Sequence, residues 1–116
     1  LIELLIVLVI IGILLAIAVP SYLGFKDRAE KKAAASNVRA AIPAAEAYYA
    51  DNGNYTGLNL TALRSIDKGV PSSVVAFGNA TNYCISDQQN NKYAKVLGPG
   101  GAVNDSASAA CTSATG

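Results

Sequence analysis

The chain has 116 residues and a net charge of +1, which is room for one domain or for one domain with an appended element. No basic run is long enough to follow a phosphate backbone, so the composition excludes a typical nucleic-acid-binding domain. Histidine is absent, which excludes His-based catalytic triads and His-ligated metal sites. We therefore expect no catalytic residue, no metal site and no cofactor, because an enzyme would depend on scattered acids such as Asp67 and Asp87.

The first twenty residues, LIELLIVLVIIGILLAIAVP, contain one charged side chain, Glu3. A helix over residues 1–25 would be ~37 Å long, enough to cross a bilayer. A secretory signal peptide is one interpretation, because Ala16-Ile17-Ala18 imitates a cleavage site, but the basic region expected before the apolar run is missing. A plain membrane anchor is a second interpretation, although such an anchor has no use for Glu3.

A third interpretation accounts for the charge: the segment occupies the membrane first and a protein assembly afterwards. In an apolar core the carboxylate of Glu3 is costly until it meets a cation, so it penalises every incorrect packing. We favour this interpretation, in which Glu3 sets the register between subunits.

Four cations follow the apolar segment closely: Lys26, Arg28, Lys31 and Lys32. The positive-inside rule would place them in the cytoplasm, whereas a disulfide further along the chain would need an oxidising compartment. A basic leader that once preceded Leu1 and was removed would resolve this conflict.

Residues 26–51 keep a helical composition of Ala, Lys, Glu and Arg. One apolar stripe is predicted on this amphipathic half, formed by Val38, Ile42, Ala45 and Tyr49. Asp51-Asn52-Gly53 supplies a stop signal, so a single helix of about 50 residues is predicted.

Three residues should weaken this helix. Gly12 lowers its local stability, and Pro20 removes a backbone hydrogen bond, so we expect a kink at Pro20. Pro43 should bend the amphipathic half or split it in two.

Residues 52–116 have the composition of a soluble domain, rich in Gly, Asn, Ser and Thr. A connecting region with one helical turn around Leu60 to Ile66 should come first. Strands are predicted over SSVVAF, NYCIS and KYAKVL, the last two joined through DQQNN. The predicted fold is α+β, a long helix over residues 1–51 packed against a head with a small antiparallel sheet of three or four strands. The tail after GPGG is low in complexity.

The two cysteines, Cys84 and Cys111, are too few for a zinc site. A disulfide between them would stabilise the fold by roughly 3.5 kcal/mol on the chain-entropy model and would hold the tail. The alternative is two unrelated buried thiols.

Four Asn-X-Ser/Thr matches could carry N-linked sugar, and the Ser/Thr-rich tail could carry O-linked sugar. The matches are at Asn54, Asn59, Asn79 and Asn104. In a chain this rich in Asn, Ser and Thr, some of these matches are expected by chance.

The segment LIELLIVLVIIGILLAIAVPSY closely resembles the N-terminal segment of the type IV pilins, with most similarity to major pilins of the type IVa kind. The motif is highly specific and covers residues 1–25. The run AEAYYADNGNYT at the helix end and one cysteine pair near the C-terminus are also similar to the family. The usual mature start is a Phe and a small polar residue before LIELLIV, which implies that two residues precede Leu1.

The resemblance implies that a prepilin peptidase removes a basic leader and methylates the new N-terminus. The subunit would wait in the inner membrane until an ATPase-driven machine lifts it into an extracellular filament of identical copies. Glu3 would attract the N-terminal amine of a neighbouring subunit, and the helix would loosen between Gly12 and Pro20. The core of the filament would be packed by the apolar residues Leu4, Leu5, Val7, Leu8, Ile11, Leu14 and Leu15.

The leading hypothesis is thus the major subunit of a type IV pilus that serves adhesion, twitching motility or DNA uptake. A pseudopilin of a type II secretion or competence system is the first alternative, and a membrane-anchored binding domain is the second. No small-molecule substrate is expected, and nucleic acid would be contacted only by the assembled filament.

Overall fold

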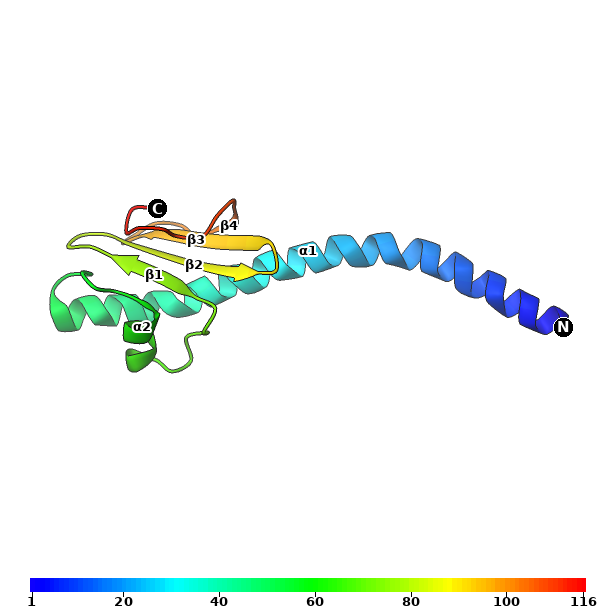
Figure 1. The fold of residues 1–116 in the computed structure, drawn as a ribbon, viewed down its shortest axis with the longest axis horizontal. Coiled ribbons are helices and arrows are strands. Elements are labelled where there is room, and N and C mark those ends of the chain that lie inside the picture. Colours follow the sequence, from blue (N-terminus) through cyan, green and yellow to red (C-terminus); the bar gives the residue numbers. More distant parts are fainter.

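The computed structural model describes the backbone of residues 1–116 and every side chain except those of residues 19–21. The molecule measures 75 × 25 × 18 Å. Its radius of gyration is 20.4 Å, against about 13 Å for a compact chain of this length. Figure 1 shows the cause: a long helix, α1 (Ile2–Asn52), extends far beyond a small head that packs against its C-terminal half.

Helix α1 contains 51 residues, which confirms the predicted long helix. It ends at the predicted stop signal, where Gly53 has φ of 76° and its N–H donates to the carbonyl of Tyr49 at 2.7 Å. Glycine suits this left-handed conformation because it has no Cβ. The expected kink at Pro20 lies outside the residues whose side chains are described.

The predicted split at Pro43 is wrong, because α1 continues through this residue without a break. Proline cannot donate to the carbonyl of Arg39, four residues earlier. Pro43 and Arg39 are both exposed, so water can satisfy that carbonyl. Buried alanines on either side of Pro43 hold the helix against the head.

The buried stripe of α1 is rotated from the predicted one. Val38 and Ala45 are fully buried as expected, but Ile42 is half-buried and Tyr49 is 44% exposed. The centre of the stripe is mostly alanine, formed by Ala34, Val38, Ala41 and Ala45. Small side chains let the sheet approach the helix closely, and the larger residues pack along the margins.

A short second helix, α2 (Leu60–Ile66), occupies the position of the predicted helical turn. Asn59 caps it, because its side-chain oxygen accepts the N–H of Ala62 at 2.8 Å. Leu63 is fully buried and joins the same hydrophobic cluster as Val38. This contact fixes α2 against α1.

The head contains a four-stranded antiparallel sheet in the order β1-β2-β3-β4, which agrees with the predicted three or four strands. The strands are β1 (Val75–Gly78), β2 (Tyr83–Gln89), β3 (Lys92–Gly98) and β4 (Asn104–Ala107). The long central pair, β2 and β3, is in register from Tyr83 opposite Gly98 to Gln89 opposite Lys92.

Two details of the sheet differ from the sequence prediction. The β2–β3 connection is a two-residue turn at Asn90 and Asn91, because β2 continues to Gln89 instead of ending before DQQNN. Asn90 has φ of 54°, a left-handed conformation that asparagine tolerates well. Strand β4 lies in the low-complexity tail, outside the three strand runs predicted, and its pairing with β3 contains an irregularity.

The sheet is buried on both faces along β2. Ile85 and its neighbours Ala94 and Val96 belong to the hydrophobic core that the sheet shares with α1. Cys84 and Ser86 alternate with these residues and so point to the opposite face, yet both are fully buried. The C-terminal tail covers that face, where the hydroxyl oxygen of Ser86 accepts the backbone N–H of Cys111 at 3.0 Å.

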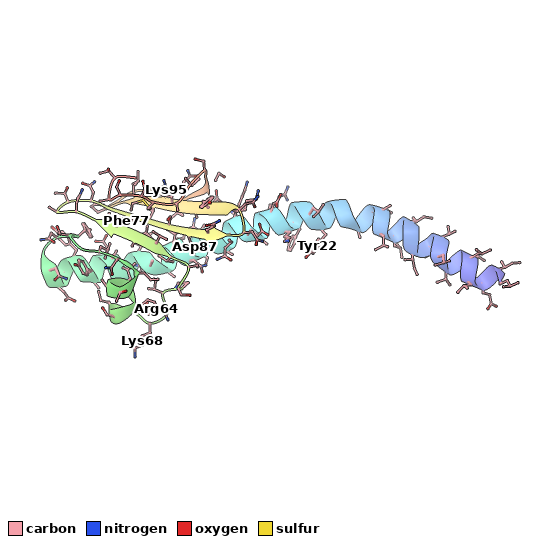
Figure 2. The ribbon with its side chains drawn as sticks, in the orientation of Figure 1. Tyr22, Arg64, Lys68, Phe77, Asp87 and Lys95 are labelled. Atoms are coloured by element: carbon pink, nitrogen blue, oxygen red, sulfur yellow. A yellow bond between two sulfur atoms is a disulfide. The ribbon has the colours of Figure 1, made fainter. Side chains whose placement is uncertain are left out.

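Asp87 is the main polar link between the sheet and α1, and it lies between them in Figure 2. Only 1% of this residue is exposed. The Asp87 carboxylate accepts hydrogen bonds from Asn37 of α1 at 2.9 Å, from Gln89 at 3.0 Å and from the hydroxyl of Ser73. These three donors satisfy the buried carboxyl group and tie β2 to α1 and to the segment before β1.

Candidate assembly surface

The N-terminal half of α1 is the largest exposed apolar surface of the described part of the chain (Figure 1). Its most apolar 18-residue stretch has a mean hydropathy of 3.2, and none of that stretch is buried within the chain. This half is long and apolar enough to cross a membrane. A surface of this kind needs lipid or other protein to cover it.

The residues predicted to pack a filament core all lie on this surface. Each of them is about half to two-thirds exposed: Leu4, Leu5, Val7, Leu8, Ile11, Leu14 and Leu15. They are distributed around the helix and not along one stripe, because a helix turns through about 100° per residue. One neighbour could cover only one side, so several neighbours or a lipid phase must surround this half of α1.

Glu3 lies in the first turn of α1 and is exposed. A carboxylate in this position is favoured by the positive end of the helix dipole. Among the described side chains, the ion pairs are Lys26–Glu30 and Lys32–Asp105, and Glu3 takes part in neither of them.

Gly12 lies within the apolar half of α1, and a Cβ built there would meet nothing within 4 Å. The fold of the single chain therefore does not need glycine at this position. Pro20, the other predicted weak point, is outside the residues whose side chains are described.

Cys84 and Cys111 form a disulfide with Cα atoms 6.0 Å apart, which confirms the predicted link. Cys84 lies in β2, and Cys111 lies in the tail that crosses the outer face of the sheet. The disulfide therefore fixes the tail over the sheet.

The four predicted glycosylation positions, Asn54, Asn59, Asn79 and Asn104, share a local structure. Three of the side-chain oxygens accept the backbone N–H two residues later: Asn54 from Thr56, Asn79 from Thr81 and Asn104 from Ser106. The fourth caps α2. This turn and cap chemistry explains why asparagine occupies these positions. Whether any of them carries sugar stays a prediction.

A tyrosine cluster closes the end of the head that lies farthest from the apolar half of α1. The Tyr55 hydroxyl donates to both carboxylate oxygens of Glu46, at 3.1 and 3.2 Å. The Tyr55 ring is 4.8 Å from that of Tyr49 and 4.9 Å from that of Tyr83. Burial, reinforced by the Glu46 charge, raises the pKa of Tyr55 and of Tyr83 to about 12. A Cβ at Gly98 would collide with the Tyr83 ring, so this site requires glycine.

Asp67 and Asp87, the acids on which an enzyme would depend, both have structural partners. Asp67 is in an exposed turn, where its carboxylate accepts the N–H of Gly69 at 2.8 Å. Asp87 is held by its three donors beneath the sheet. Among the described residues, no group of three His, Cys, Asp or Glu side chains is placed to hold a metal ion.

Three known proteins are similar to this chain. The type IV wide pilus major component PilA4 of Thermus thermophilus is 37% identical over 89 residues, which is 73% of this chain and 67% of that protein. The type II secretion system core protein G of Escherichia coli is 39% identical over 59 residues, 51% of this chain and 41% of that protein. The type IV major pilin protein PilA of Myxococcus xanthus is 39% identical over 56 residues, 48% of this chain and 26% of that protein.

The matches thus span less than half of the Escherichia coli and Myxococcus xanthus proteins. No protein-family model matches the chain. The long helix, its exposed apolar half and the small disulfide-linked head define a class of protein, a pilin-like filament subunit. The relatives agree with this class, and the chain belongs to the type IV pilin family.

Proposed function

We propose that this chain is the major subunit of a type IV pilus, an extracellular filament that serves adhesion, twitching motility or DNA uptake. The observation that carries the proposal is the division of α1, whose second half is covered by the head and whose first half is exposed on every side. Copies of the chain can cover that first half by bundling their helices. The filament then has an apolar core and an outer layer of heads.

Glu3 sets the register of this bundle in the proposed mechanism. In the apolar core its charge is unfavourable unless a cation lies beside it. The N-terminal amine of a neighbouring copy can supply that cation. Misplaced copies leave the carboxylate unpaired, so Glu3 favours one arrangement of subunits over the others.

Before assembly, the first half of α1 resides in the inner membrane, which covers the same apolar surface with lipid. A prepilin peptidase and the pilus assembly machinery are the protein partners of this stage. Gly12 and Pro20 provide a weak point at which the helix can loosen as it moves from lipid into the filament. The head and its disulfide face the oxidising side of the membrane.

A pseudopilin of a type II secretion system is the second candidate, supported by the similarity to the Escherichia coli secretion protein. Such a subunit would use the same helix in a short or internal filament. Two relatives named as pilus components favour the pilus, and the match to one of them covers 73% of this chain at 37% identity.

The test is to shear intact cells and to collect the released fraction. The amount of filament in that fraction that contains this chain is then measured. Wild type is compared with Glu3→Gln, which keeps the shape of the side chain and removes the charge. Asp67→Asn is a matched control, because it removes a carboxylate from an exposed turn of the head.

We expect abundant filaments from wild type and from the control, and at least a tenfold loss in Glu3→Gln while its membrane level is unchanged. A chain that stays in the membrane under every condition would support the pseudopilin and contradict the pilus. Filaments that form normally in Glu3→Gln would contradict the role of Glu3 but not the pilus.

A further inference from the structure

The strongest unexplained feature is a group of basic side chains at the junction between the apolar half of α1 and the head. The helix contributes four of them immediately after Phe25, and the turn between β2 and β3 brings a fifth from far along the chain. We call this group the basic collar; it consists of Lys26, Arg28, Lys31, Lys32 and Lys92.

A hydrogen bond places the β2–β3 turn at the level of the collar. The Asn90 side-chain amide donates to the Glu30 carboxylate at 2.7 Å. Figure 1 shows this end of the hairpin lying against α1, on the side of the head that faces the apolar half of the helix. Lys92, two residues beyond Asn90, therefore lies close to the end of the apolar segment.

The charges of the collar are partly compensated within the chain. Lys32 pairs with Asp105 at 3.0 Å, which lowers the pKa of that carboxyl, and Lys26 is 4.0 Å from Glu30. Among the described ion pairs, none includes Lys31 or Lys92. The collar has five cations, and the three acids beside it are Asp27, Glu30 and Asp105. The region therefore keeps a net positive charge.

Lys31 and Lys92 line the same hollow, of about 210 Å³, together with Asn91, Tyr93, Asp105, Ser106 and Ala107. Both lysines are half-buried, as expected for side chains whose stems lie against the protein while their ammonium groups reach solvent. Asn91 and Ser106 add neutral polar groups. The Asp105 carboxylate also lines the hollow, but it is paired with Lys32 at 3.0 Å, so two cations and neutral donors remain for a phosphate group.

The position of the collar matches that of a lipid headgroup. Residues 1–25 of a membrane-resident helix cover ~37 Å, somewhat more than the ~30 Å hydrocarbon core of a bilayer. Lys31 lies about 9 Å further along the helix, so residues 1–31 cover ~46 Å, close to the ~40–45 Å of a bilayer with both headgroup layers, and Lys31 lies at the outer edge of the headgroups. Tyr22 and Phe25 are aromatic residues at the level where membrane proteins place such side chains.

From this arrangement we propose that the basic collar, through Lys31 and Lys92, binds the phosphate of an anionic lipid in the membrane before the subunit is assembled. The inference rests on the membrane-resident stage of the proposed function. It also gives a role to cations that the positive-inside rule would place on the other side of the membrane. The bound lipid holds the head at a fixed height over the bilayer.

The test uses the full chain in lipid nanodiscs made from equal parts of phosphatidylcholine and phosphatidylglycerol. Native mass spectrometry then counts the lipids of each kind that stay on the chain. The variant Lys31→Gln/Lys92→Gln removes the two cations of the hollow. The matched control is Arg64→Gln/Lys68→Gln, which removes two exposed cations from the α2 side of the head, away from the collar (Figure 2).

Wild type and the control should retain phosphatidylglycerol over phosphatidylcholine by roughly tenfold. The collar variant should retain both lipids about equally. The same near-ultraviolet circular dichroism in all three chains would show that the head is folded.

Equal retention of both lipids by wild type, or an undiminished preference in the collar variant, would overturn the inference. Phosphate adducts formed from millimolar inorganic phosphate in discs of phosphatidylcholine alone, without preference for phosphatidylglycerol in mixed discs, would identify a free-phosphate site and also overturn it. A chain that fails to enter nanodiscs would contradict the proposed membrane stage instead.

Discussion

The two halves of α1 belong to one continuous helix but meet different surroundings. The first half carries large Leu, Ile and Val side chains on all sides, and these are exposed. The second half buries a narrow stripe centred on Ala34, Val38, Ala41 and Ala45 beneath the head. Hydrophobicity alone therefore does not tell which half contacts the rest of the chain.

Side-chain size accounts for the difference. A small stripe allows one sheet to approach the helix closely, and this contact is complete within a single chain. Large side chains on every side leave the first half without a partner in the same chain, so it needs lipid or other copies. The same substitution should therefore have different effects in the two halves of α1.

The largest effect is expected from Leu63→Ala, which opens a cavity between α2 and the second half of α1. Truncation of a buried Leu should lower the free energy of unfolding of the head by about 3 kcal/mol. Leu14→Ala removes the same atoms from the exposed half and should change the stability of the head by less than about 0.5 kcal/mol. Urea denaturation of both chains in detergent micelles tests this difference, and equal losses would contradict it.

A smaller loss is expected when the alanine stripe is enlarged. Ala41→Leu inserts a large side chain where the sheet meets α1, and it should lower the free energy of unfolding by about 2 kcal/mol. Ala16→Leu adds the same atoms to the exposed half, where nothing has to move. Thermal unfolding should separate the two variants by several degrees. A stable Ala41→Leu head would show that the packing of the stripe is loose.

High pH should weaken the attachment at the far end of the second half. The pKa of Tyr55 and of Tyr83 is about 12 in the folded chain, above the ordinary value of 10.0, so ionisation favours the unfolded state. The stabilising effect of the neutral phenols is complete below pH 10 and should be lost between pH 10 and 12. Because the two tyrosines are in contact and both shifts depend partly on Glu46, their losses are not additive and should total about 2 kcal/mol by pH 12.

Urea denaturation across this pH range, compared with Tyr55→Phe and Tyr83→Phe, measures the loss. Each phenylalanine variant should show a smaller decline than wild type. An identical decline in all three chains would assign the effect to other groups.

The smallest effect on the single chain is expected at Gly12. Gly12→Ala should stabilise the first half of α1 by about 1 kcal/mol, because alanine favours helix and its Cβ meets no atom there. If loosening at Gly12 assists assembly, filament yield should fall although the helix is more stable. Circular dichroism in micelles and the shear assay measure the two quantities, and unchanged yield would remove Gly12 from the assembly step.

Much of the fold could be predicted because its signals are local. Adjacent residues encode three of these features: the end of α1 at Gly53, the short helix α2, and the alternating strands β2 and β3. The stripe on α1 was misplaced because the prediction gave the large side chains of Ile42 and Tyr49 more weight than the small ones of Ala34 and Ala41. In this fold the close approach of the sheet favours the smaller residues.

Features that depend on distant residues were harder to predict. Strand β4 has a polar sequence and forms because β3 offers it an edge, which no local pattern reveals. The basic collar was visible only as four cations near Phe25, because Lys92 joins them through the β2–β3 turn. Glu3 was singled out from the sequence alone, since a charge in an apolar run is conspicuous at any position, and its role in assembly stays a prediction.

Electron cryomicroscopy of the sheared filaments is the measurement that tests the central claim most directly. The account predicts that residues 2–25 of neighbouring copies pack together at the filament axis, with Glu3 beside the N-terminal amine of another copy and the heads outside. Filaments held together by their heads, with residues 2–25 left outside the core, would contradict it.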